Sequence, residues 1–103
     1  MFMQYINGEL VEGKGAPFRV YNPATDEIVE TLNGASAEQV QETLEGAQRA
    51  FPSWAATPLN ERIVLLKRFR EEVIKEKETI AMMIHQEVGL SWPESLGEVD
   101  TIT

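Results

Sequence analysis

From residue 36 to the end of the chain, apolar residues recur at spacings of three and four, which is the period of an α-helix. Ser36 and Gln39 form a capping box, in which each residue can bond the backbone N–H of the other, so we expect a helix to begin there. Pro52 is expected to end this helix, because the residue before a proline avoids helical angles. The sequence therefore predicts a first helix over residues 36–51, with Trp54 in the connection that follows.

A second helix is predicted from Thr57-Pro58, where a preferred cap residue precedes a proline at the first helical position. Gly89 is the residue type that commonly follows a helix end, so the helix is expected to cover residues 58–88, or roughly 30 residues. Lys77 interrupts its apolar stripe. The stripe consists of Leu59, Ile63, Leu66, Phe69, Val73, Ile80, Ile84 and Val88.

A third helix is predicted to start at a second capping box, Ser91 to Glu94. Its apolar positions include Leu96 and Val99, and no stop signal precedes Thr103. We therefore expect a helix over residues 92–103 whose pattern is cut off.

The first third of the chain carries turn signals instead of helical periodicity. Asn7-Gly8 supplies the positive φ angles of a two-residue hairpin turn, so residues 4–11 are predicted to form a hairpin. A second hairpin is expected around Pro23, which fixes its own φ angle, with Asn22 and Asp26 tolerant of left-handed angles. The predicted fold class is α+β, with hairpins over about residues 4–32 followed by two long helices and the start of a third.

The charge balance limits the partners of this chain. It carries 17 acidic and nine basic side chains, a net charge of −8, which disfavours nucleic acid and anionic lipid. No apolar run approaches the roughly 18 residues of a membrane span, and the N-terminus lacks signal-peptide features, so a cytoplasmic protein is expected. Basic and acidic residues alternate from Glu61 to Lys75, which predicts a solvated helix face with a Glu71–Lys75 ion pair.

No recognisable catalytic group is present. The chain has no cysteine, so it has no thiol nucleophile and no thiolate metal ligand. His85 is its one histidine, and general-base catalysis would require a second group to orient that ring. Gly13-x-Gly15 is only a fragment of a phosphate-loop pattern. Glu71, Glu72, Glu76 and Glu78 are assigned to the polar face of one helix, so we predict no catalytic, cofactor-binding or metal-binding residue in this chain.

The order of these motifs resembles the N-terminal segment of the NAD(P)-dependent aldehyde dehydrogenases. The resemblance spans all 103 residues and rests on five motifs in order. They are Tyr5-Ile6-Asn7-Gly8-Glu9, Phe18 to Glu27 (FRVYNPATDE), Ala50-Phe51-Pro52-Ser53-Trp54, Thr57 to Arg62 (TPLNER) and Glu87 to Val99. Three positions depart from the family pattern: Asp26 replaces a turn glycine, and Leu90 and Ser91 replace a Lys-Pro pair.

The resemblance implies a longer protein in which a cysteine attacks the aldehyde, a glutamate acts as base and hydride passes to NAD or NADP. Those residues would lie later in sequence, and this segment would be a peripheral part of a Rossmann-like cofactor domain. Some family members bind an alkali cation at positions that correspond to Val20, Tyr21 and Glu87. Because Glu87 stands where those members have aspartate, we expect no metal in this chain. The resemblance also places the cofactor-contacting strands later in sequence, so we expect no bound cofactor.

Three functional hypotheses follow. In the first, the chain is the N-terminal segment of an aldehyde dehydrogenase and is inactive alone, because the family's covalent step needs a thiolate. In the second, it is a stand-alone helical interaction module that self-associates or binds a protein partner through exposed apolar helix faces. In the third, which we rank last, His85 and the glutamates form an enzyme of their own.

Overall fold

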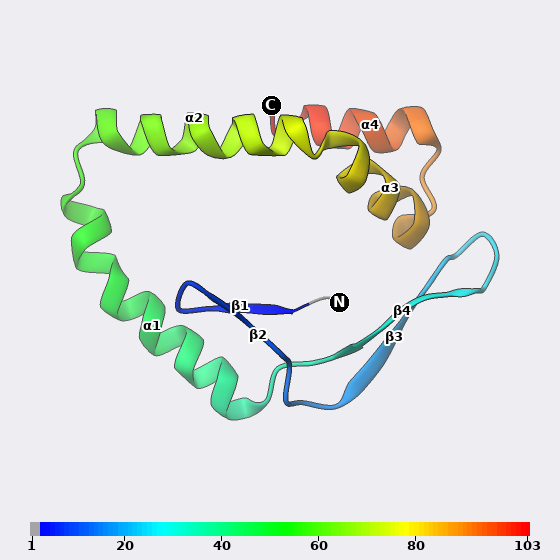
Figure 1. Ribbon diagram of the computed structural model, residues 1–103, viewed down its shortest axis with the longest axis horizontal. Helices are drawn as coiled ribbons and strands as arrows, with labels where there is room; N and C mark the ends of the chain where they lie inside the picture. The colour runs from blue at the N-terminus through cyan, green and yellow to red at the C-terminus, as the bar shows by residue number, and fades with distance from the viewer. Residues whose placement is uncertain (1–2) are drawn as a thin grey trace. The chain divides into compact units, whose positions relative to one another are not determined.

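The computed structural model describes residues 3–103, which divide into two compact units (Figure 1). The first unit comprises the residues up to Val20 together with Glu30–Thr57, and the second comprises Tyr21–Val29 together with Pro58–Thr103. The elements in chain order are β1 (Gln4–Ile6), β2 (Glu9–Val11), β3 (Pro17–Tyr21), β4 (Ile28–Asn33), α1 (Ala37–Ala56), α2 (Leu59–Lys75), α3 (Lys77–Val88) and α4 (Trp92–Asp100).

Both predicted hairpins are present. Strands β1 and β2 pair antiparallel, with Tyr5 opposite Leu10, and the turn between them places Asn7 at φ 53° and Gly8 at φ 84°. The positive angles expected of the Asn-Gly dipeptide are therefore confirmed. Ile6 of β1 is buried, which gives this small ribbon one inward-facing side chain.

The hairpin of β3 and β4 turns as the sequence predicts. The Asn22 N–H donates to the Glu27 carbonyl at 2.8 Å, and the Asn22 side-chain oxygen accepts from the Ala24 N–H at 2.9 Å. Asp26 adopts φ 58°, the left-handed conformation expected of the residue that replaces a glycine. Local turn chemistry therefore determines this corner of the chain.

Helix α1 begins at the predicted capping box and continues past the predicted end. Pro52 lies inside the helix and Trp54 follows it in the last turn, so the expectation of an end at residue 51 is wrong. Two side-chain hydroxyl groups that follow the proline donate hydrogen bonds to backbone carbonyls of the same helix. The Ser53 hydroxyl donates to the Ala50 carbonyl at 3.0 Å, and the Thr57 hydroxyl donates to the Ser53 carbonyl at 2.9 Å.

The predicted cap at Thr57 is also wrong. Thr57 ends α1 with its N–H bonded to the Trp54 carbonyl, and Pro58 occupies the N-cap position of α2 without a side-chain hydrogen bond. The hydroxyl of Thr57 is already bonded to α1, so it does not cap the next helix.

The long helix predicted over residues 58–88 is two helices. The break falls at Glu76, at φ −96° and ψ 12°, and α3 diverges from α2 beyond it (Figure 1). The break turns the residues on both sides of it toward α4. Packing explains the change of direction, because the buried core of the second unit takes Val73 from α2, Ala81 from α3 and Val99 from α4. Ile80, Ile84, Trp92 and Leu96 pack around these three.

The second unit contains two ion pairs that the sequence did not predict. Lys75 pairs with Glu72 at 2.6 Å and not with Glu71, and this hydrogen bond raises the pKa of the Lys75 ammonium. Lys77, the residue that interrupts the apolar stripe, reaches Asp100 of α4 at 2.5 Å. The interruption therefore marks a contact between α3 and α4.

The end of α3 and the start of α4 lie at the residues that the sequence predicted. Gly89 ends α3 in the left-handed conformation at φ 80°, and Ser91 and Glu94 form the second capping box. Helix α4 ends at Asp100, three residues before the predicted end, because the N–H groups of Ile102 and Thr103 bond carbonyls three residues back.

Candidate functional site

His85 lies at the end of α3 and contacts the start of α4. Its Nδ1 is 2.5 Å from the Leu90 carbonyl oxygen, and its ring meets the Trp92 ring edge-on, with centroids 6.4 Å apart and an angle of 85°. Because a carbonyl only accepts, Nδ1 must carry the proton in this contact. The imidazole thus links the end of α3 to the start of α4. That His85 takes no part in catalysis remains a prediction.

The glutamates that the sequence placed on a polar helix face are all exposed: Glu71, Glu72, Glu76 and Glu78. Within residues 3–103, no three histidine or acidic side chains come close enough together to hold a metal ion. The cation position inferred from family resemblance, which includes Glu87, is not part of any such group among these residues.

The two capping boxes lower the pKa of nearby carboxyl groups. At α4, hydrogen bonds from the Ser91 hydroxyl and then from its backbone N–H lower the pKa of Glu94. At α1, a hydrogen bond from its own backbone N–H and then one from Ser36 lower the pKa of Glu38. These carboxylates stabilise the helix starts above their unfolded pKa, and this contribution is lost as the pH falls through the lowered values.

The Gly13-x-Gly15 segment has its backbone amides in use. The Gly15 N–H donates to the Gly34 carbonyl at 2.7 Å, and the Lys14 N–H donates to Gln39 Oε1 at 2.8 Å. A phosphate-binding loop needs such amides free to face the ligand. The glycines instead allow this loop to approach the backbone of the segment before α1.

Gln39 joins that loop to α1 and is 5% exposed. Its Oε1 accepts from the Ser36 N–H at 3.0 Å and from the Lys14 N–H, while its Nε2 donates to the Glu12 carbonyl at 2.9 Å. The sequence predicted the first of these bonds and missed the other two. The available signal was the amide itself, since a glutamate at this capping position could accept but could not donate.

An open hollow of about 610 Å³ lies where the β1–β2 turn meets α1. The Asn7 amide donates to Glu42 beside it, at 3.4 Å, and Arg49 supplies the single charged side chain of its lining. No acid–base pair or nucleophile lines it, so this hollow offers a place for contact but no chemistry. The remaining lining residues are Gly8, Thr43, Gly46, Ala47 and Ala50.

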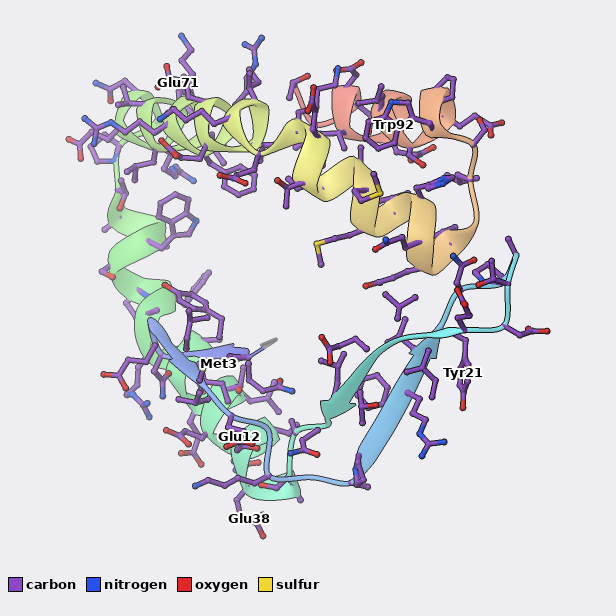
Figure 2. All side chains as sticks on the ribbon, turned by 45° about the vertical axis from the view of Figure 1, so that its right-hand side comes forward. Met3, Glu12, Tyr21, Glu38, Glu71 and Trp92 are labelled. Carbon is purple, nitrogen blue, oxygen red and sulfur yellow. The ribbon has the colours of Figure 1, made fainter. Side chains whose placement is uncertain are left out.

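The most extensive candidate surfaces are apolar, one on α1 in the first unit and one on α2 in the second. Large hydrophobic side chains project from both helices (Figure 2), and Phe51 and Leu59 are each 67% exposed. Monomeric proteins rarely expose large contiguous apolar patches, which mark interaction surfaces. The exposed positions are Val40, Leu44, Phe51 and Trp54 on α1 and Leu59, Ile63, Val64, Leu65, Leu66, Phe69 and Ile74 on α2. Within residues 3–103, no helix has both the length and the apolar character to cross a membrane.

Known proteins are similar in sequence to most of this chain. The sequence model of the Aldehyde dehydrogenase family matches residues 10–103. The chain belongs to the aldehyde dehydrogenase family. Among curated relatives, it is 37% identical over 98 residues to N-succinylglutamate 5-semialdehyde dehydrogenase of Acinetobacter baylyi and 38% identical over 95 residues to that of Burkholderia thailandensis. These alignments cover 95% and 92% of this chain and 20% of each relative.

Solved aldehyde dehydrogenases share the fold. The NAD-dependent benzaldehyde dehydrogenase of Corynebacterium glutamicum superimposes with a TM-score of 0.90 at 28% identity, over 96% of this chain and 22% of that one. The NADP-dependent glyceraldehyde-3-phosphate dehydrogenase of Bacillus halodurans gives 0.88 at 29% identity, over 95% and 21%. The predicted family and fold class are confirmed, and the chain spans about a fifth of the length of these relatives.

Proposed function

We propose that this chain serves as the N-terminal structural segment of an NAD(P)-dependent aldehyde dehydrogenase that oxidises an aldehyde or semialdehyde to the carboxylate. The chain contributes helices and hairpins to a larger cofactor domain and contributes no reacting group. The observation that carries this proposal is the match of residues 10–103 to the family, over a fifth of its relatives' length. The names of those relatives, semialdehyde dehydrogenases among them, support the substrate class.

The same proposal makes the isolated chain inactive. Covalent acyl transfer to an enzyme sulfur requires a thiolate, and the sequence contains no cysteine. We therefore expect the purified 103-residue chain to form no NADH or NADPH above the buffer rate with succinate semialdehyde or benzaldehyde. A full-length family member, assayed at the same molar concentration, serves as the positive control. Turnover by the chain alone would contradict the assignment.

A second candidate function is protein association. Its supporting observation is the exposed apolar surface on each of α1 and α2, which a chain on its own would leave in water. We propose that the isolated chain covers part of this surface by self-association. Sedimentation over micromolar concentrations is expected to show masses above the 11.6 kDa of one copy. A constant mass of one copy, combined with cooperative unfolding, would reject this candidate and leave the dehydrogenase proposal standing.

A further inference from the structure

The first unit contains the same reactive dipeptide twice. Of the four asparagines in the chain, two are followed directly by glycine, at Asn7-Gly8 and Asn33-Gly34. A glycine has no Cβ to shield its backbone nitrogen or to restrict its rotation, so that nitrogen readily attacks the side-chain amide of a preceding asparagine. Both asparagines are exposed, so accessibility does not distinguish them. Any difference in their reactivity comes from how the fold holds each dipeptide.

Deamidation at such a dipeptide uses only the protein and water. The glycine nitrogen, after losing its proton to solvent hydroxide, bonds to the asparagine Cγ and closes a succinimide ring. The Cγ–Nδ2 bond breaks, and the side-chain nitrogen takes a proton from water and leaves as ammonia. Water then opens the ring at either carbonyl, which yields aspartate or isoaspartate. In isoaspartate the main chain runs through the side-chain carbonyl and is longer by a methylene group.

The Asn33-Gly34 backbone is held by hydrogen bonds on both residues. The Gly34 N–H, which must lose its proton before the nitrogen can attack, donates to the Ala16 carbonyl at 3.0 Å. The Gly34 carbonyl accepts from the Gly15 N–H at 2.7 Å. The Asn33 carbonyl accepts from Gln4 Nε2 at 3.4 Å. Attack by Gly34 would break the first of these bonds and strain the others, so we expect the folded first unit to suppress the reaction here.

The Asn7-Gly8 backbone lacks these restraints. The dipeptide forms the two-residue turn between β1 and β2, and within residues 3–103 the Gly8 N–H donates to no backbone or side-chain acceptor. Each of the two strands has three residues. A two-stranded hairpin is at best marginally stable by itself, so its turn can open without unfolding of the whole unit. The attacking nitrogen is therefore available and the backbone around it can rotate.

The Asn7 side chain lies against α1, so its conversion changes a contact between elements. Its Nδ2 donates to the Glu42 carboxylate at 3.4 Å, and its Oδ1 lies so close to Gly46 that a methyl group there would overlap it. A carboxylate at position 7 would lose the donor and face a like charge. The longer main chain of isoaspartate would also disrupt the pairing of Ile6 with Glu9 across the turn. Ile6 is buried, so loss of this register removes a core side chain from its place.

We propose that Asn7-Gly8 is a site of spontaneous deamidation and that its conversion to isoaspartate releases the β1–β2 hairpin from α1. Asn33-Gly34 is the same dipeptide kept unreactive by its backbone hydrogen bonds. The inference does not depend on the dehydrogenase proposal, because every contact that it uses lies within the first unit of this chain.

The first test compares the two dipeptides in one sample. The purified chain is incubated in mildly alkaline buffer, and peptide mapping by mass spectrometry follows conversion of amide to acid at each asparagine. In the folded chain we expect Asn7 to convert at least about tenfold faster than Asn33, because only Asn33-Gly34 must first break backbone hydrogen bonds. In guanidinium chloride, which removes the fold, the two rates should agree within about threefold. Equal rates in the folded chain, or the same ratio with and without denaturant, would overturn the proposal.

The second test concerns the hairpin. The isoaspartate form is separated by chromatography and identified by labelling with an isoaspartyl methyltransferase. Amide hydrogen exchange in β1 and β2 is expected to be at least about tenfold faster in this form than in the unmodified chain, because the strand register is lost. Asn7→Asp is the matched control, since it adds the carboxylate without lengthening the main chain, and its exchange should stay within about threefold of the original. An isoaspartate form whose hairpin exchanges as slowly as the unmodified hairpin would overturn the proposed release.

Discussion

Replacing Gly15 with alanine is expected to destabilise the first unit by about 3 kcal/mol. A Cβ at this position would lie 2.4 Å from the Ala35 carbonyl oxygen and 2.8 Å from the Ala35 carbonyl carbon. Both are backbone atoms of the segment that leads into α1, so they cannot rotate away as the end of a side chain could. Overpacking of this kind costs about 1 to 3 kcal/mol, and the fixed backbone on both sides places Gly15 at the upper end.

The same substitution also threatens a hydrogen bond. The Gly15 N–H donates to the Gly34 carbonyl at 2.7 Å, and relieving the clash by separating the two segments would lengthen it. Urea unfolding followed by far-ultraviolet circular dichroism measures the loss. Gly34→Ala is the matched control, because its nearest atom would be the Ala16 carbonyl oxygen at 3.4 Å, and it should cost less than about 1 kcal/mol. Equal losses for the two variants would show that the close approach at Gly15 is not what matters.

Gly15 illustrates what the sequence could predict and what it could not. Asn7, Asp26 and the two capping boxes act within four residues of themselves, so local chemistry was enough to place them. The reason for glycine at position 15 is a backbone about 20 residues further along the chain. The sequence identified a loop there, and only the fold explains why positions 13 and 15 of that loop must be glycine.

The helix boundaries show the same division. The apolar spacing from residue 59 to 88 is interrupted only at Lys77, so it predicts one helix. The break at Glu76 depends on α4, because Val73 and Ala81 both pack with Val99 in the core. Conversely, Pro52 predicted the end of the first helix, yet α1 continues to Ala56. Both errors arise where tertiary packing or side-chain bonding outweighs a local preference.

The candidate site divides differently. The sequence alone showed which reactive side chains are present and that cysteine is not among them. It also predicted the family correctly. The apolar surfaces of the two helices were foreseen only in outline, because a stripe of apolar residues predicts a buried face without saying what buries it. That the Nε atom of Arg62 is buried and has no hydrogen-bond partner within residues 3–103 could be learned only from the structure.

Removing the side chain of Gln39 is expected to destabilise the first unit by about 2 to 4 kcal/mol. Gln39→Ala deletes three hydrogen bonds at once, to the Ser36 and Lys14 N–H groups and to the Glu12 carbonyl. Each lost bond between partly buried groups costs on the order of 1 kcal/mol, and a backbone group left unpaired costs more. The loop of residues 12–16 should also detach from α1, so the Lys14 amide proton should exchange with solvent markedly faster.

Two further variants separate the roles of this side chain. Gln39→Glu keeps the acceptor for Ser36 and Lys14 but places an oxygen against the Glu12 carbonyl where Nε2 now donates, so it should lose about half as much stability as Gln39→Ala. Gln41→Ala is the matched control two residues along α1. Its amide bonds only the exposed Glu45 carboxylate at 2.8 Å, and its loss should cost less than about 0.5 kcal/mol. Urea unfolding ranks the three variants, and a Gln39→Glu variant as stable as the original chain would show that the bond to Glu12 contributes nothing and that capping alone makes Gln39 important.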